Sequence, residues 1–143
     1  MPRPETPLLT VDVIIELLER PGEVVFIERR NEPLGLALPG GFVDRGETVT
    51  AAAVREAREE TGLDVTLEGM LGVYSDPGRD PRGHTASIVF VGRASGEPRA
   101  GDDAGGVRVM PPDKAQELVF DHARIIEDYL STGEVRFEPP FVR

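Results

Sequence analysis

The sequence predicts a single α/β domain, residues 1–143, in which strands and helices alternate along the chain. The 143 residues fall within the usual size of one domain. Apolar residues alternate or run continuously in several short segments, as in strands, and two longer segments have the composition and spacing of helices. The order strands, helix, strands, helix indicates a mixed α/β fold. There is no cysteine, which excludes a disulfide framework and a thiolate metal site.

Two strands are predicted at the start of the chain. Apolar residues dominate 8–18 and again 23–27, and the turn-forming residues Arg20-Pro21-Gly22 lie between them. The two strands are therefore expected to be joined directly by this turn. A loop rich in glycine and proline is expected to follow from Asn31 to Gly46.

Residues 48–61 are predicted to form the first helix, because most of them are good helix formers. Thr48 is expected to be the N-cap, and Gly62 is a natural residue to follow the last turn. Small and apolar side chains on one flank are expected to let the helix pack closely against a sheet. These side chains are Ala51, Val54 and Ala57.

The second half of the chain repeats the pattern of strands followed by a helix. Residues 120–130 have apolar side chains three and four positions apart, which is typical of a helix. Residues 76–83 are polar and contain two prolines, so a loop is expected there. The tail, residues 134–143, is expected to be irregular. Strands are expected at 65–75, 84–93 and 106–110.

The charge balance narrows the classes of partner. Lys and Arg number 16 and Asp and Glu number 26, which gives a net charge of -10. Nucleic acids and anionic membranes both require basic surfaces, so neither is an expected partner. No apolar run is long enough for a transmembrane helix, and residues 1–7 lack the apolar core of a signal peptide. Since cysteine is also absent, a cytoplasmic location is expected.

Three carboxylates fall on one side of the helix expected at 48–61. Glu56, Glu59 and Glu60 are spaced i, i+3 and i+4, where like charges repel. A divalent cation, Mg²⁺ or Mn²⁺, relieves such repulsion because it takes oxygen ligands. Alternatively the residues form a solvated face, with Arg55 in an ordinary salt bridge to Glu59. The wider sequence favours the metal site.

The residues around these carboxylates follow a longer pattern. From Gly41 the sequence reads Gly-x5-Glu-x7-Arg-Glu-Ala-x-Glu-Glu-x-Gly-Leu. This pattern resembles the Nudix box, the signature of the Nudix hydrolases, and the preceding Leu38-Pro39-Gly40 is also similar. The seven fixed positions are Gly41, Glu47, Arg55, Glu56, Glu59, Glu60 and Gly62.

The resemblance implies a fold and a reaction. It implies a Nudix-type α/β/α sandwich with a mixed sheet, in which the box forms a loop–helix–loop. Nudix hydrolases cleave the diphosphate of a nucleoside diphosphate linked to another moiety, and they use divalent metal ions. Water attacks one phosphorus while the other phosphate leaves, and the metal ions neutralise the growing charge. An acidic protein can bind an anionic substrate in this way.

The resemblance also implies roles for the residues of the box. Glu59 and Glu60 look like direct metal ligands, and Glu56 looks like a ligand or the base that acts on the attacking water. The carbonyl of Gly40 resembles a further ligand, and Glu47 resembles an additional metal group.

Two further residues are implied beside this metal set. Arg55 looks like a residue that orients the carboxylates without touching the substrate. Outside the box, Asp103 in Gly101-Asp102-Asp103-Ala104 is the candidate for an additional catalytic carboxylate. Many relatives have a Glu shortly after such a segment, whereas glycines follow here, at 105 and 106. Alternatively Asp102 and Asp103 simply form a turn.

Residues outside the box bear on the substrate. The loop from Ser75 to His84 resembles that of small ADP-ribose pyrophosphatases, a subgroup associated with a proline after the box, here Pro77. The segment Phe120-Asp121-His122 is also similar to that subgroup. The resemblance therefore implies hydrolysis of ADP-ribose to AMP and ribose 5-phosphate. The candidates to bind phosphate or ribose through a guanidinium are Arg29 and Arg30 before the box, and Arg79 or Arg82 after it.

The aromatic residues and histidines leave alternatives open. Many relatives have a tryptophan two residues before the Leu-Pro-Gly-Gly segment, whereas this chain has Leu36 and no tryptophan. The candidates to stack on adenine are therefore Tyr74, Phe42 and Phe90, each of which is alternatively a core residue. His84 and His122 are expected to have ordinary structural roles.

Other functions remain open. Within the family, the alternative is a (d)NTP or dinucleoside-polyphosphate pyrophosphohydrolase. From a different class, the alternative is a non-catalytic nucleotide-sugar sensor, although such sensors tend to lose box carboxylates that are all present here. The expected partner is a small nucleotide. A homodimer is also expected, because enzymes of the resembled subgroup are commonly dimers.

Overall fold

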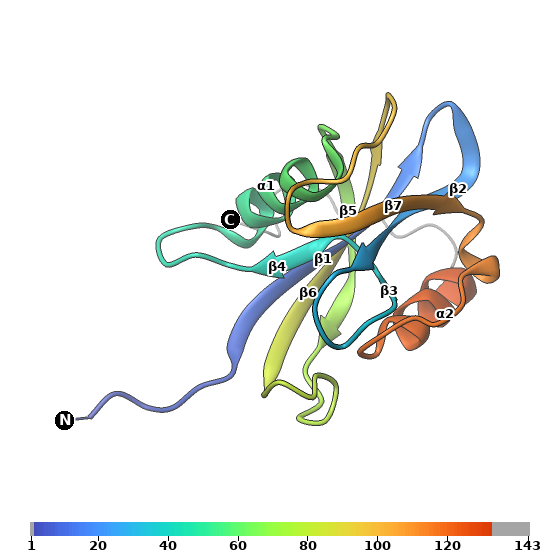
Figure 1. Ribbon diagram of the computed structural model, residues 1–143. Coiled ribbons are helices and arrows are strands. Elements are labelled where there is room, and N and C mark those ends of the chain that lie inside the picture. Colours follow the sequence, from blue (N-terminus) through green and yellow to red (C-terminus); the bar gives the residue numbers. More distant parts are fainter. Residues whose placement is uncertain (1, 133–143) are drawn as a thin grey trace.

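A sheet of seven strands lies between two helices, as expected for an α/β/α sandwich (Figure 1). The computed structural model describes residues 2–132, and the tail expected at 134–143 lies outside the described residues. The helices are α1 (Val49–Thr61) and α2 (His122–Thr132), with a short 3-10 helix at Pro112–Lys114. The strands are β1 (Leu8–Leu17), β2 (Arg20–Arg29), β3 (Leu36–Ala37), β4 (Gly40–Phe42), β5 (Thr66–Tyr74), β6 (Thr85–Ala94) and β7 (Ala104–Met110).

The sheet is mixed, and β1 lies at its centre. The strands follow in the order β3-β2-β1-β6-β5, while β4 also pairs with β1 and β7 with β2. Strands β1 and β6 are parallel, and the other pairs of described strands are antiparallel. The short strand β4 is therefore fixed against the middle of the sheet, with Gly40 opposite Asp12.

Side chains of β1 alternate between two hydrophobic cores, one on each face of the sheet. Val11, Val13 and Ile15 pack into the core that contains the buried alanines of α1. Ile14 packs into the other core with Ile125 of α2. All five side chains are completely buried. The central strand therefore holds both helices in place, and it fixes where their ends meet the sheet.

Helix α1 begins and ends where the sequence predicts. The Thr48 hydroxyl accepts a hydrogen bond from the Ala51 N–H at 3.1 Å, which caps the first turn. Gly62 ends the helix in the left-handed conformation, with a φ of 71°, and its N–H donates to the Arg58 carbonyl. Both expected caps are confirmed.

The face of α1 that contacts the sheet differs from the expected one. Ala52, Ala53 and Ala57 are completely buried, whereas Ala51 is exposed and Val54 is half-buried. The helix is rotated relative to the expectation: its small side chains pack into the core, and its carboxylate side lies against β4. This rotation directs the acidic residues of the box into the hollow beside that strand.

Two expectations about the first half of the chain are wrong. The turn between β1 and β2 lies at Leu18–Glu19, and Arg20-Pro21-Gly22 begin β2. The segment 31–46, expected to be a loop, contains β3 and β4. These short strands exist because they pair with β2 and β1, and such pairing between distant segments leaves no periodic pattern in the sequence.

Two boundaries in the second half also differ from the prediction. Strand β7 begins at Ala104 rather than at residue 106. Helix α2 begins at His122 rather than at Phe120. Phe120 has a φ of 57°, a left-handed conformation that is uncommon for a bulky residue and cannot begin a helix.

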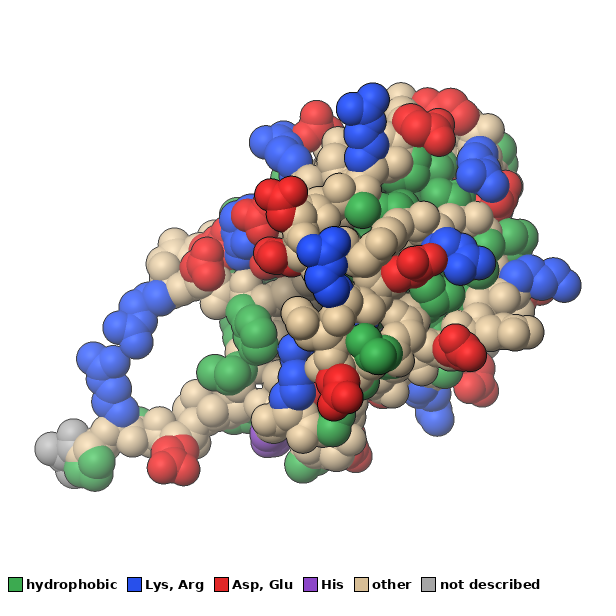
Figure 2. Space-filling view, in the orientation of Figure 1, with side chains coloured by type: hydrophobic (Ala, Val, Ile, Leu, Met, Phe, Trp, Pro, Cys, Tyr) green, Lys and Arg blue, Asp and Glu red, His purple; other side chains and the backbone are tan. Residues whose placement is uncertain are grey.

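The surface carries charges of both signs. Figure 2 shows acidic and basic side chains interspersed over one face, and the exposed N-terminal segment 2–7 extends away from the fold. Among the helices of residues 2–132, none combines the length and the hydropathy needed to cross a membrane.

Candidate active site

Helix α1 and strand β4 form one wall of a cavity. The Gly40 N–H of β4 donates a hydrogen bond to Glu60 Oε1 of α1 at 2.9 Å. A Cβ added to Gly41 would lie 2.5 Å from the Glu56 carboxylate. Glycine at position 41 therefore leaves the room that this carboxylate occupies, and the backbone of β4 lies directly against the acidic side of α1.

Arg55 holds several carboxylates together behind this wall. Its Nε donates to Glu47 at 2.7 Å, and its Nη1 donates to Glu56 at 2.9 Å and to Glu59 at 3.2 Å. Its Nη2 donates to the Phe42 carbonyl at 3.0 Å, which ties β4 to α1. Neither Arg55 nor Glu47 lines the cavity itself. The guanidinium therefore orients the carboxylates of the box from the side away from the cavity.

The carboxylates differ in how easily they ionise. Hydrogen bonds from Arg55 lower the pKa of Glu47 to about 2. Burial raises the pKa of Glu56, although Arg55 opposes this shift. Burial raises the pKa of Glu60 to about 8, and the nearby charges of Glu56 and Asp12 act in the same direction, against the hydrogen bond from the β4 backbone. Glu60 is therefore the carboxylate of this group that most needs a compensating cation.

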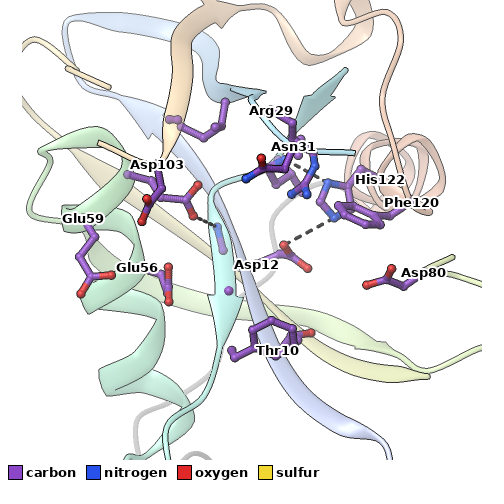
Figure 3. Close-up of a pocket in the computed structure, with 18 of the residues that line it drawn as sticks. Thr10, Asp12, Arg29, Asn31, Glu56, Glu59, Asp80, Asp103, Phe120 and His122 are labelled. Carbon is purple, nitrogen blue, oxygen red and sulfur yellow. Dashed lines mark hydrogen bonds and ion pairs between the residues drawn. The ribbon is translucent and has the colours of Figure 1, made fainter. Parts of the chain in front are cut away.

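The cavity has a volume of about 690 Å³, and its two sides differ in chemistry. In Figure 3, Glu56, Glu59 and Asp103 lie on one side, while Arg29 and Phe120 lie on the other. The volume is in the range of small-molecule binding sites. The cavity therefore offers an acidic wall and, facing it, a wall with basic and aromatic groups.

The second wall is built around Phe120. The guanidinium of Arg29 lies 4.9 Å from the centre of the Phe120 ring, and that of Arg82 lies 5.1 Å from it. Arg82 also lies 5.9 Å from the Phe42 ring, and it forms an ion pair with Asp80 at 2.9 Å. Burial lowers the pKa of Arg29, and the charge of Arg82 adds to this effect. An anion between the two guanidinium groups would relieve their repulsion.

A loop next to α1 forms the upper edge of the acidic wall. The Gly101 N–H donates to the Glu60 carbonyl at 3.1 Å. Arg30 donates to the carbonyls of Asp102 at 2.8 Å and Ala104 at 2.9 Å. Asp102 and Asp103 form a turn, as the alternative interpretation has it, and both also line the cavity. Arg30 thus holds this loop in place through its backbone.

The floor of the cavity contains buried polar residues. Sequence reasoning missed Asp12, whereas Arg79 was a candidate to bind substrate and His122 was expected to have a structural role. Asp12, Arg79 and His122 are each less than a tenth exposed. His122 Nε2 lies 3.5 Å from Asp12 Oδ1, and Arg79 Nη2 lies 3.8 Å from Asp12 Oδ2. The available signal for Asp12 was its position, because it is an acidic residue inside an otherwise apolar strand segment. Arg79 comes from a distant loop and His122 from the start of α2, so their contact with Asp12 leaves no pattern in the sequence.

Some candidates from the sequence lie elsewhere. Pro77 is not among the residues that line the cavity. Tyr74 donates to Asp128 of α2 at 2.7 Å outside it, and Phe90 is buried in the core beside α1. The candidates that the fold does bring to the cavity are Gly40, Phe42, Glu56, Glu59, Glu60, Asp103, Arg29, Arg30, Arg79 and Arg82.

Comparison with known families identifies this arrangement. A family model described as the NUDIX domain matches residues 7–129, which include both walls of the cavity. The chain belongs to the Nudix family. The expectation of a Nudix-type pyrophosphohydrolase is confirmed at this level.

Named Nudix relatives share most of the chain. It is 48% identical over 127 residues to an ADP-ribose pyrophosphatase of Methanocaldococcus jannaschii, covering 87% of this chain and 73% of that protein. It is 31% identical to a putative 8-oxo-dGTP diphosphatase of Bacillus subtilis, covering 85% of this chain and 80% of that protein.

A solved structure has a similar fold. This is a bifunctional NMN adenylyltransferase/ADP ribose pyrophosphatase of Francisella tularensis, complexed with AMP and a Mn ion, with a TM-score of 0.77 and 27% identity. The match covers 88% of this chain but 42% of that protein, so this chain spans less than half of it.

Nudix hydrolases use divalent metal ions, and the residues of the acidic wall suit such an ion. Carboxylate and carbonyl oxygens are the donors that Mg²⁺ and Mn²⁺ prefer. Glu60 is half-buried, and none of the described residues forms an ion pair with it. No three acidic or histidine side chains of residues 2–132 already converge as a metal cluster, since Arg55 binds Glu56 and Glu59 instead. The donors therefore suit the metal and would be drawn together by it.

Proposed function

We propose that this Nudix protein hydrolyses ADP-ribose to AMP and ribose 5-phosphate, with Mg²⁺ as the metal ion and Mn²⁺ as a substitute. The observation that carries the proposal is a cavity that joins an acidic wall to a basic and aromatic one. A metal-bound diphosphate suits the first wall and a nucleoside the second. The 48% identity to an ADP-ribose pyrophosphatase supports the choice of substrate.

The acidic wall would hold the reacting diphosphate. Glu59, Glu60, Glu56 and the carbonyl of Gly40 are the groups proposed to hold the metal, with Glu47 acting through Arg55. A divalent cation bound there would neutralise charge on the diphosphate and favour ionisation of a water molecule. Glu60 supports this assignment because burial disfavours its negative charge and none of the described side chains forms an ion pair with it.

The reaction needs one proton acceptor. The oxygen of a water molecule forms a bond to one phosphorus, the bridging P–O bond breaks, and its electron pair leaves with the other phosphate. The proton of the water goes to a carboxylate. Asp103 and Glu56 are the candidates, since both line the cavity. Asp103 is held near the acidic wall by the bonds of Arg30 to the loop backbone.

The opposite wall would hold the rest of the nucleotide. Arg29 and Arg82 present two positive charges close to Phe120, an arrangement that suits a phosphate or ribose oxygen. Phe42 is 45% exposed and lines the cavity, so it is available to stack on adenine. Phe120, which lines the cavity, is a second aromatic candidate that was not among those expected to stack on adenine.

A substrate panel tests the proposal. With Mg²⁺ present, we expect ADP-ribose to be hydrolysed to AMP and ribose 5-phosphate with a kcat/KM above that of any nucleoside triphosphate or dinucleoside polyphosphate. The products are separated by ion-exchange chromatography. If a triphosphate is hydrolysed about a hundredfold more efficiently than ADP-ribose, the proposed substrate is wrong although the family remains. No hydrolysis of any panel member would favour a non-catalytic sensor.

Two expectations about the cellular form remain predictions. A homodimer is expected, and sedimentation of the purified protein tests it. A cytoplasmic location is expected, and cell fractionation tests it.

Arg55→Lys is expected to lower kcat while KM for ADP-ribose changes little. Lysine keeps the positive charge, but its single ammonium cannot replace the fork that binds Glu47, Glu56 and Glu59 together. Steady-state kinetics on the variant, with Arg58→Lys as a control on the exposed side of α1, measures the two constants. A large rise in KM at unchanged kcat would instead mean that Arg55 binds the substrate.

Glu60 is expected to make the stability of the metal-free protein fall as pH rises. The unfolded chain releases this proton near pH 4.5 and the folded chain near pH 8, so the folded state holds more protons between these values. Stability therefore decreases from pH 5 to pH 8 by at most about 1.4 kcal/mol per pH unit, and this contribution then levels off. Melting curves in EDTA measure the effect. Glu60→Gln should remove it, whereas Glu59→Gln, at an exposed side chain, should not; parallel curves for all three proteins would contradict it.

A further inference from the structure

The backbone of residues 38–41 has to be held firmly, because it touches the acidic wall directly. Its Gly40 N–H donates to Glu60, and its Gly40 carbonyl is one of the proposed ligands. On one side the segment pairs with β1, where the Val13 N–H donates to the Pro39 carbonyl at 2.9 Å. Proline has no N–H to donate in return. The next available donor is the N–H of Leu38.

That donor is bound by a histidine from another part of the chain. The Leu38 N–H donates to His122 Nδ1 at 3.0 Å, and this bond is buried. His122 is the first residue of α2, and it is 2% exposed. A backbone N–H that is buried away from water needs a hydrogen-bond acceptor, and here the imidazole supplies it. The bond therefore joins the start of α2 to the segment that carries Gly40.

Asp12 sets the orientation of this imidazole. An Nδ1 that accepts a hydrogen bond places the ring proton on Nε2 in the neutral form. That nitrogen faces Asp12 Oδ1 at 3.5 Å, as Figure 3 shows. Asp12 is itself fixed, because Ser87 Oγ donates to its other oxygen at 2.5 Å. Asp12 also stands opposite Gly40 in the β1–β4 pair. The contacts of His122 therefore begin at the Leu38 N–H and lead through Asp12 back to the same short segment.

We propose that His122, oriented by Asp12, is a positioning residue that holds the Leu38–Gly41 backbone where it serves the metal-binding wall. It touches no reacting atom and acts through the Leu38 N–H. The proposal concerns the cavity of the proposed function and rests on that function for its kinetic test. Its other tests do not depend on the identity of the substrate.

Two substitutions of equal polarity separate the two contacts of the ring. In His122→Asn the side-chain oxygen takes the place of Nδ1 and can still accept from the Leu38 N–H. In His122→Gln the amide reaches toward Asp12 and the acceptor for Leu38 is lost. His84→Gln is the matched control, since His84 bonds the Ser75 carbonyl outside the cavity.

The expected result is a clear difference between the two variants. His122→Gln should lower kcat for ADP-ribose about tenfold with little change in KM, and should weaken Mn²⁺ binding, titrated without substrate, by about tenfold. His122→Asn should stay within about threefold of the wild type in both measurements, and His84→Gln should match the wild type. Equal losses in both His122 variants, or no loss in either, would overturn the proposal.

A measurement on the unmodified protein covers the case in which a variant does not fold. In the ¹⁵N-labelled wild type, a coupling across the hydrogen bond between the Leu38 nitrogen and His122 Nδ1 is expected, with the imidazole proton on Nε2. Absence of this coupling, or a ring proton on Nδ1, would overturn the proposal. If the wild type does not hydrolyse ADP-ribose, the proposed function fails, while Mn²⁺ binding and the coupling still decide the role of His122.

Discussion

Glu60→Gln is expected to lower kcat for ADP-ribose by about 100-fold, equal to ~3 kcal/mol of transition-state stabilisation, while the protein still folds. Glutamine keeps the length of the side chain and its helix propensity. It also keeps an oxygen that can accept from the Gly40 N–H, the bond that now spans 2.9 Å. What it removes is the negative charge that a metal ion would bind most strongly.

The melting temperature of Glu60→Gln, measured with and without Mg²⁺, is a second test of the metal site. Mg²⁺ should raise the melting temperature of the wild type, because an ion that binds the folded state stabilises it, and should raise that of the variant less. Without metal, the variant should be at least as stable as the wild type at pH 8, since burial opposes the charge of Glu60.

A carboxylate outside the cavity provides the control. Glu68→Gln on β5 removes an exposed ion pair with Arg93, so turnover and the response to Mg²⁺ should stay at wild-type levels. If Glu60→Gln also kept wild-type turnover, Glu56, Glu59 and Glu60 would be a solvated helix face, and the proposed metal site would be wrong.

Local sequence signals predicted the parts of the fold that local interactions determine. Thr48 and Gly62 marked both ends of α1, because a hydroxyl cap and a left-handed glycine act within one turn of the helix. The alternating strands were also located to within a few residues. The spacing of the box placed Glu56 and Glu60 on the cavity side of the same helix.

Contacts between distant segments could not be predicted in this way. Strand β4 forms by pairing with β1, and its glycine-rich sequence indicated a loop. Phe120 and His122 line the cavity although they are far from the box in the sequence, and no local signal indicated the left-handed backbone at Phe120. Arg30, a candidate to bind substrate, lines the cavity and also donates to backbone carbonyls of a loop that the sequence did not place beside it.

Gly41→Ala is the second substitution with a large expected effect. The added Cβ would lie 2.5 Å from the Glu56 carboxylate, which is the far end of a flexible side chain. We therefore expect the protein to fold and the carboxylate to move, breaking its 2.9 Å bond to Arg55. A displacement of this size at a reacting centre costs about 100-fold in kcat. The melting temperature should fall by only a few degrees, or about 1 kcal/mol.

The neighbouring glycine separates this displacement from a general loss of stability. In Gly40→Ala the new Cβ overlaps the Val11 carbonyl and Asp12, which belong to the central strand and cannot move aside, so the melting temperature itself should fall strongly. In Gly72→Ala on β5 the Cβ makes an ordinary 3.6 Å contact with Tyr74, and neither activity nor stability should change much. Kinetics and melting curves on the three variants test the argument. If Gly41→Ala kept full activity, the position of Glu56 against β4 would have no part in catalysis, because the carboxylate cannot stay where it is once the methyl group is present.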